Sequence, residues 1–177
     1  MTEEDLKTAI GNVLRNHAHI LDVNYDKCGY VEYCFQSLLL TEIFDIIGNK
    51  YGQVAQKSVL AEQLYHTYNT AWTATNEGTK NKLRCDIYIN NLDGLPCYIE
   101  IKADKTASSG NQNCDFVKRV SADFEKMESL SLERKGNHGR RSCMLLLLPA
   151  DNKGDYTGYS DTIKAGNFQI KYGLYYL

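Results

Sequence analysis

Apolar residues recur every three or four places over the first fifty positions, which is the period of an amphipathic helix. Thr2 stands where a helix N-cap is expected, with acidic residues in the turn that follows. A second helix is expected over 30–49, with Gly48 as its stop, and a third over 54–69. The apolar stripe of the first helix consists of Leu6, Ile10, Val13 and Leu14.

From about residue 70 the period falls to two, as in a β-strand with one buried face. The segment 70–76 (TAWTATN) is rich in threonine and aromatic residues, so we expect it to form a first strand. The segments 84–90 (RCDIYIN) and 97–103 (CYIEIKA) alternate strictly, so each has an apolar face and a polar face. The apolar faces carry Cys85, Ile87 and Ile89 on one strand and Cys97, Ile99 and Ile101 on the other.

The remaining pattern predicts a crossover and two further strands. An amphipathic helix is expected over about 114–132, where Phe116, Val120 and Phe124 recur at helical spacing. The continuously apolar run 142–149 is typical of a strand buried on both faces and lying parallel to an earlier one, and 168–177 supplies a last strand. The order predicts an α/β (α+β) fold with a mixed sheet preceded by N-terminal helices.

Composition limits the class of protein. With 177 residues, 43% of them hydrophobic, and no Pro/Ser/Gly-rich linker, the chain is expected to form one domain. No signal peptide is evident, and no apolar run approaches the ~20 residues of a membrane span, so a cytoplasmic protein is expected. The six cysteines include no CxxC pair, which favours buried free thiols over a zinc site or a disulfide framework.

Positive charge is concentrated in the middle of the chain. The net charge is −2, but residues 1–79 hold 5 Lys and Arg against 10 Asp and Glu, whereas residues 80–141 hold 12 against 9. A phosphate-facing surface is therefore expected in the middle segment, although a solvated surface of mixed charge explains the same counts.

Three charges interrupt the alternating strands: Asp86, Glu100 and Lys102. Glu100 and Lys102 are two residues apart and must share a face. A two-residue turn would pair residues whose numbers sum to 187 and put Asp86 on the other face. A three-residue loop, Leu92-Asp93-Gly94, gives a sum of 186 and places Asp86 opposite Glu100.

Two carboxylates at opposed positions repel each other unless a cation lies between them. Mg²⁺ or Mn²⁺ meets that need, because such hard cations bind one or two carboxylates together with water and phosphate oxygens. Lys102 would then stabilise charge on the nucleophile or on the transition state. The plainer alternative is an exposed Glu–Lys strand pair, or a Lys102 that bridges Asp86 and Glu100 in a structural domain.

The arrangement "RCDIYIN…CYIEIK" resembles the PD-(D/E)XK nuclease superfamily, whose restriction-endonuclease-like core runs α-β-β-β-α-β. The resemblance covers residues 54–148, or 30–148 with the second helix, leaving helical residues 1–50 before the core and 149–177 as a C-terminal extension. It implies Asp86 and Glu100 as metal ligands and Lys102 as the catalytic lysine. Cys85 stands where the superfamily's name puts a proline, which is often missing.

Many members of the superfamily also place a glutamate on the first core helix. Glu62 is chosen here because its helix immediately precedes the first strand. Glu42 is flanked by apolar residues at helical spacing, and Glu32 heads the same helix, so both remain alternatives.

The sequence thus predicts a Mg²⁺-dependent endonuclease that hydrolyses DNA phosphodiester bonds through Asp86, Glu100, Lys102 and Glu62. Cutting both strands of a duplex needs two such sites, so a homodimer is expected, with the N-terminal helices as its interface. The rival hypothesis is a binding module for nucleic acid or protein that uses the same fold without catalysis.

Overall fold

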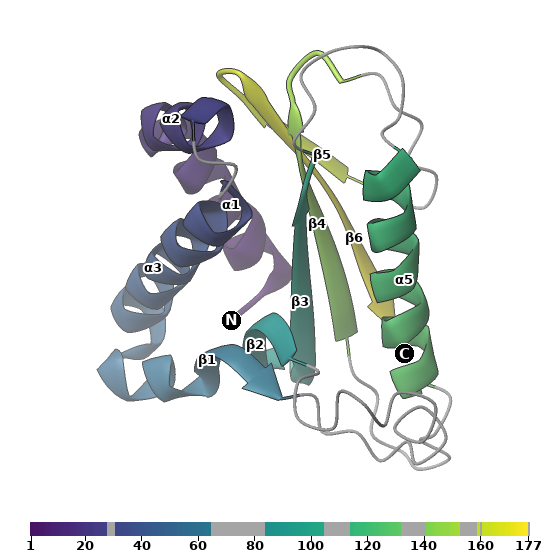
Figure 1. Ribbon diagram of the computed structural model, residues 1–177. Helices are drawn as coiled ribbons and strands as arrows, with labels where there is room; N and C mark the ends of the chain where they lie inside the picture. The colour runs from purple at the N-terminus through teal and green to yellow at the C-terminus, as the bar shows by residue number, and fades with distance from the viewer. Residues whose placement is uncertain are drawn as a thin grey trace.

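A computed structural model describes residues 1–27, 31–64, 84–104, 114–131, 141–152, 159 and 161–176. One six-stranded mixed sheet lies between two layers of helices, with α1, α2 and α3 on one face and α5 on the other (Figure 1). The elements are α1 (Glu3–Asn16), α2 (Ala18–Lys27), α3 (Val31–Tyr51), η1 (Gln53–Ser58), β1 (Val59–Leu64), β2 (Arg84–Leu92), β3 (Leu95–Ala103), α5 (Cys114–Ser131), β4 (Arg141–Pro149), β5 (Asp161–Ala165) and β6 (Phe168–Tyr176).

Helix α1 begins as the sequence predicts. The Thr2 hydroxyl accepts the Asp5 N–H, and the Asp5 carboxylate accepts the Thr2 N–H at 2.7 Å, which together form a capping box. The predicted apolar stripe of α1 is completely buried. The helical segment then breaks at His17, so its end belongs to a separate helix, α2.

Helix α3 confirms the second predicted helix but runs past Gly48, so the predicted stop is wrong. The chain leaves the helix at Gly52, whose φ of 84° is easily reached only by glycine. Helix α3 continues through Gly48 because this part of the helix packs against Gln56. The side-chain amide of Gln56 donates to the Phe44 carbonyl at 2.9 Å.

The third helix predicted over 54–69 is wrong over its described part. Residues Gln53–Ser58 form a 3₁₀ turn, and Val59–Leu64 form strand β1. The chain pairs there with β2, from Val59 opposite Ile89 to Leu64 opposite Arg84. This pairing with β2 decides the structure of the segment, because the local sequence pattern suits a helix and a strand equally well. The strand predicted at 70–76 lies outside the described residues.

The order of strands in the sheet is β1-β2-β3-β4-β6-β5. Strands β3 and β4 are parallel, as predicted, and the other neighbouring pairs are antiparallel. Helix α5 occupies the predicted crossover position between β3 and β4, and β6 confirms the predicted last strand. Strand β5, a short edge strand paired to β6, was not predicted.

The apolar side chains form a core on each face of the sheet. The larger core packs α1, α2 and α3 against residues such as Ile87, Ile99 and Leu145. The smaller core packs Phe116 of α5 on Met144, Leu146 and Leu148. Strand β4 contributes to both cores, which confirms that it is buried on both faces. No helix within the described residues is long and apolar enough to cross a membrane.

Candidate active site

The hairpin between β2 and β3 has the predicted register but not the predicted turn. Its tip is a two-residue turn in which Asp93 and Gly94 both have positive φ, 48° and 85°. Leu92 therefore pairs with Leu95, but an irregularity between Ile89 and Leu92 shifts the register by one, so that Ile89 pairs with Cys97. The bulge, and not the loop length, sets the register that puts Asp86 in line with Glu100.

The pairing of β2 with β3 runs only as far as Ile87 and Ile99, whereas β2 goes on pairing with β1 as far as Arg84 and Leu64. We call the position beyond the Ile87–Ile99 pair the β2–β3 fork. Here Cys85 packs with Tyr98 and not, as its alternation predicted, with the core that holds Ile87.

Two carboxylates accept the backbone amides along the edge of β3 at the fork. The Ile101 N–H donates to Asp86 Oδ2 at 2.6 Å, and the Ala103 N–H donates to Glu32 Oε2 at 3.1 Å. Glu32 lies in the first turn of α3. The next turn of that helix supplies Gln36, whose side-chain amide donates to the Asp86 carbonyl at 2.8 Å. Helix α3 is thereby joined to both strands at the fork.

The Lys102 ammonium lies among three acceptors. Its Nζ is 3.1 Å from the Ile101 carbonyl oxygen, 3.1 Å from Asp123 Oδ2 on α5, and 3.4 Å from Glu32 Oε1 on α3. An ammonium has three N–H donors, so these acceptors can use all of them. The Lys102 side chain is only 14% exposed, which makes these ion pairs more than surface contacts. We call Glu32, Asp86, Glu100, Lys102 and Asp123 the fork cluster.

Negative charge exceeds positive charge within the fork cluster, since four acids surround one lysine. Burial, followed by the nearby charge of Glu100, raises the pKa of Asp86 from 3.8 to about 7. Burial by itself would lower the pKa of Lys102, but the carboxylates of Glu32 and Asp123 outweigh it and raise that pKa above its ordinary value. Glu100 is itself only 2% exposed. Two acids are thus held together with little water to screen them.

The structure brings together Asp86, Glu100 and Lys102 as the sequence predicts, but the choice of Glu62 rested on a wrong element. Glu62 lies in strand β1 and not on a helix; its register position, between Ala61 and Gln63, is opposite Asp86. Glu42 lies elsewhere, bonded to Asn12 at 2.9 Å and 3.4 Å from His17. Among the described side chains, Glu32 is the α3 glutamate that meets Lys102.

Asp123 was missed, although the sequence carried a signal for it. It stands three residues after Val120 and directly before Phe124, on the same stripe of α5 that packs against the sheet. An acid in that position is costly to bury without a partner. The partner, Lys102, lies on a strand that precedes the helix, so only the fold identifies it.

The fork cluster has the donor chemistry of a hard divalent cation site, because its ligands are carboxylate oxygens. Burial, more than the charge of Glu100, raises the pKa of Asp86, whereas the nearby Lys102 lowers it. The described residues contain no group of three or more His, Cys, Asp and Glu side chains arranged to hold a metal. A cation at Asp86 and Glu100 would have to take the rest of its ligands from water and substrate.

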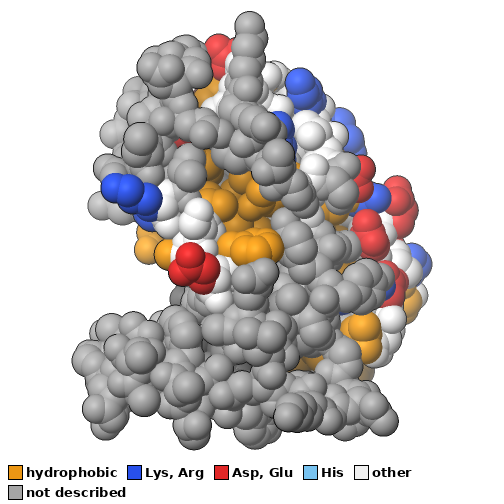
Figure 2. Space-filling model, turned by 90° about the vertical axis from the view of Figure 1, so that its right-hand side faces the viewer, with side chains coloured by type: hydrophobic (Ala, Val, Ile, Leu, Met, Phe, Trp, Pro, Cys, Tyr) orange, Lys and Arg blue, Asp and Glu red, His pale blue; other side chains and the backbone are white. Residues whose placement is uncertain are grey.

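On the face of the molecule drawn in Figure 2, the described side chains form no single basic stripe. On the face drawn in Figure 2, the acidic and basic side chains of the described residues are interspersed. Several cations of the segment 80–141, which was expected to face phosphate, lie outside the described residues, among them Lys80, Lys105 and Arg140. Arg141 is only 7% exposed and forms an ion pair with Asp93 at 2.7 Å, so it holds the turn between β2 and β3 and is not available at the surface to bind phosphate.

Comparison with known proteins identifies no relative: no family model, no curated protein and no solved structure matches the chain. Among the described cysteines, Cys85, Cys97 and Cys143 are buried free thiols, as predicted, whereas the free thiol of Cys34 is only half-buried. Burial raises the pKa of Cys97 to about 12.

Proposed function

We propose that this protein is a Mg²⁺- or Mn²⁺-dependent nuclease of the PD-(D/E)XK superfamily that hydrolyses DNA phosphodiester bonds. The element order supports the proposal: α3, three antiparallel strands, the crossover helix α5 and the parallel strand β4 follow the α-β-β-β-α-β order of a restriction-endonuclease-like core. The order alone carries little weight, because one fold serves many functions.

The observation that carries the proposal is the neighbourhood of Asp86, Glu100 and Lys102. Asp86 and Glu100 are the first residues beyond the last β2–β3 pair, Ile87–Ile99. Glu100 is 2% exposed, and Lys102 follows it two residues later on the same face of β3. Apart from the amide bond that Asp86 accepts, a structural sheet gains nothing from the buried carboxylate of Glu100 beside it, since an apolar residue there would be more stable. A divalent cation between them removes the repulsion and supplies a use for the arrangement.

In this proposal Asp86 and Glu100 hold the cation, whose chemistry when bound is to polarise the phosphate and lower the pKa of water. The positive charge of Lys102 stabilises the phosphate oxygens, where negative charge grows in the transition state. The oxygen of water forms a bond to phosphorus and the bond from phosphorus to the leaving oxygen breaks. The attacking water gives up a proton to solvent, and the leaving oxygen takes one up from solvent. Glu32 keeps the lysine and the edge of β3 in place through its two contacts.

A matched pair of lysine variants tests the role of Lys102. We expect wild type to nick supercoiled plasmid in millimolar Mg²⁺ and Lys102→Ala to lose at least ~100-fold in rate. Lys57→Ala, which removes an exposed lysine from η1, should cut like wild type. Equal nicking by both variants would refute the assignment of Lys102.

The proposal includes a homodimer, because two strands of a duplex require two sites. Sedimentation at micromolar concentration should give a mass of two chains, with the helices of residues 1–50 as the proposed interface. A monomer that nicks only one strand would contradict the dimer while leaving the chemistry intact.

One observation favours the rival function, a binding module without catalysis. Asp86 and Glu32 each already accept a backbone amide of β3, which is a structural role that needs no cation. Under this alternative the protein binds nucleic acid or a protein partner, Mg²⁺ leaves its stability unchanged, and no variant of the fork cluster alters a cleavage rate.

A further inference from the structure

We propose that Asp123 is the positioning residue for Lys102, fixing from helix α5 the direction in which the ammonium meets the phosphate. The inference rests on the proposed nuclease function. It adds a residue from the crossover helix to a site otherwise built from β2, β3 and the start of α3.

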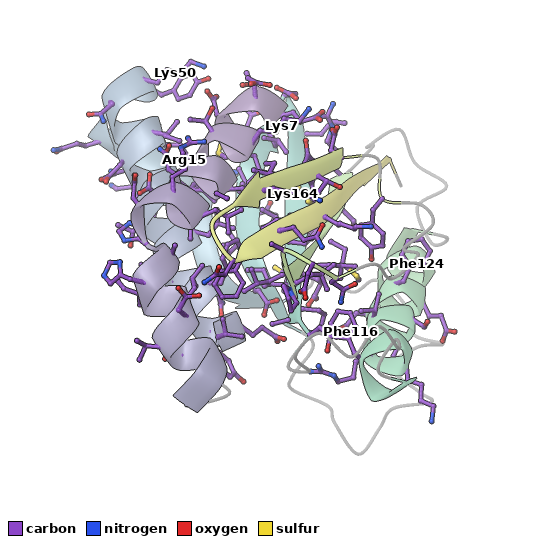
Figure 3. The ribbon with its side chains drawn as sticks, turned by 90° about the horizontal axis from the view of Figure 1, so that it is seen from above. Lys7, Arg15, Lys50, Phe116, Phe124 and Lys164 are labelled. Carbon is purple, nitrogen blue, oxygen red and sulfur yellow. The ribbon has the colours of Figure 1, made fainter. Side chains whose placement is uncertain are left out.

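Asp123 is held on a rigid support. Helix α5 is anchored to the sheet by Phe116, which is completely buried against Met144 and Leu146, and by Val120 and Phe124 packed beside it (Figure 3). Asp123 lies within this anchored stretch, and its side chain is 19% exposed. A carboxylate in that setting can move little, so it defines a direction for any cation that binds it.

A fixed carboxylate partner matters more for Lys102 than it would for a shorter side chain. A lysine has four rotatable bonds and loses up to ~2 kcal/mol of rotamer entropy when it is fixed. Its bond to Ile101 is to the preceding residue's carbonyl, which does not tie it to another element. Of its two carboxylate partners, Asp123 is the nearer, at 3.1 Å against 3.4 Å for Glu32.

The two carboxylates approach Lys102 from opposite layers of helices. Glu32 comes from α3, which packs on the larger core, and Asp123 comes from α5, which packs on the smaller one. With both in place the ammonium is confined between the layers, beside the fork. Without Asp123, Glu32 alone would draw Lys102 towards α3, so the ammonium would miss the phosphate more often although it remained charged.

The experiment compares Asp123→Asn, Asp123→Glu and the matched control Glu125→Gln, which removes an exposed acid from the same helix. Thermal unfolding first checks that all variants are folded. The side-chain ammonium of Lys102 is then observed by NMR in ¹⁵N-lysine-labelled protein, since ammonium protons held by several acceptors exchange slowly with water. Cleavage is measured over a range of DNA concentrations to separate kcat from KM.

We expect the Lys102 ammonium signal in wild type and Glu125→Gln and its loss in Asp123→Asn. We also expect kcat of Asp123→Asn to fall roughly 10- to 100-fold with KM unchanged, because a displaced Lys102 stabilises the transition state less but leaves DNA binding as it was. Asp123→Glu, which keeps the charge, should recover part of kcat.

The failures of the two proposals differ. If Asp123→Asn keeps both the ammonium signal and kcat while Lys102→Ala is inactive, the positioning role is refuted and the nuclease function stands. If wild type cuts no DNA, the nuclease function is refuted, and the role of Asp123 in the reaction is refuted with it, even where the ammonium signal depends on Asp123.

Discussion

The backbone amide of Ile101 donates to the carboxylate of Asp86 across the β2–β3 fork at 2.6 Å. The bond ties the first predicted metal ligand to the residue between the other two members of the motif, Glu100 and Lys102. It also holds the half-buried Asp86 near the buried Glu100, with burial as the main reason why the pKa of Asp86 rises to about 7. Ionised Asp86 in this position lowers the stability of the folded state, and a proton or a cation bound there would remove that loss.

This loss of stability on ionisation of Asp86 predicts that the stability of the metal-free protein depends on pH. Because the pKa of Asp86 is raised from 3.8 to about 7 on folding, the folded state binds its proton more tightly than the unfolded state does. The stabilisation from this proton is complete below pH ~4 and is lost as pH rises through 7. Asp86→Asn, which keeps an oxygen for the Ile101 amide, should be more stable than wild type at pH 8 by roughly 2–4 kcal/mol.

Urea unfolding in EDTA at pH 4, 6 and 8 measures this difference. The gap between Asp86→Asn and wild type should widen towards high pH. A gap that stays constant, or that narrows as pH rises, would show that Asp86 is ionised in the folded protein without penalty.

The same repulsion predicts stabilisation by a divalent cation. Mg²⁺ or Mn²⁺ at 100 times its dissociation constant should stabilise wild type by ~2.7 kcal/mol through mass action. Differential scanning calorimetry should show a rise in Tm that Glu100→Gln loses. Asp45→Asn, which removes an exposed acid on α3, serves as the control and should keep the rise. A rise of equal size in all three proteins would indicate weak binding away from the fork.

Glu32 should matter for stability more through its hydrogen bond than through its charge. Glu32→Ala leaves the Ala103 amide without its carboxylate acceptor and should cost ~1–3 kcal/mol. Glu32→Gln keeps an oxygen for that amide, so its loss of stability should be clearly smaller. Urea midpoints of the two variants test the difference, and equal losses would assign the effect to the ion pair with Lys102.

The start of α1 predicts a stability effect far from the fork. Asp5→Ala removes half of the capping box and the 2.7 Å bond from Lys50, so it should lower the free energy of unfolding by at least ~1 kcal/mol. Burial works against ionisation of Asp5, but hydrogen bonds, led by that of Lys50, lower its pKa to about 2. Its contribution should therefore persist above pH ~4 and disappear as pH falls through 2. Chemical unfolding at pH 3 and pH 7 tests this: an Asp5→Ala effect that is no larger at pH 7 than at pH 3 would contradict it.

The parts of the fold that the sequence predicted are those with an unambiguous period. The stripe of α1 and the apolar face of β3 pack into the larger core, and the apolar run of β4 is buried on both faces. Residues 54–64 were ambiguous because their short apolar pattern suits a helix and a strand alike. Pairing with β2 decides between the two, and no local signal reports that pairing.

The candidate site divides in the same way. Asp86, Glu100 and Lys102 were found because two strands and one hairpin relate them. The register was correct although the predicted turn was wrong, since a bulge compensates for the shorter loop. Glu32 and Asp123 meet Lys102 from helices far away in sequence, and which acid of a helix reaches the fork depends on how that helix packs.

The most direct test of the central claim is reversal of DNA nicking by removal and return of the cation. Wild type should convert supercoiled plasmid to the nicked form in Mg²⁺, stop when EDTA is added, and resume when Mg²⁺ is restored in excess. Asp86→Asn should remain folded and nick at least ~100-fold more slowly, while Asp45→Asn matches wild type. Nicking by Asp86→Asn at the wild-type rate, or nicking that continues in EDTA, would contradict a cation-dependent site at the β2–β3 fork.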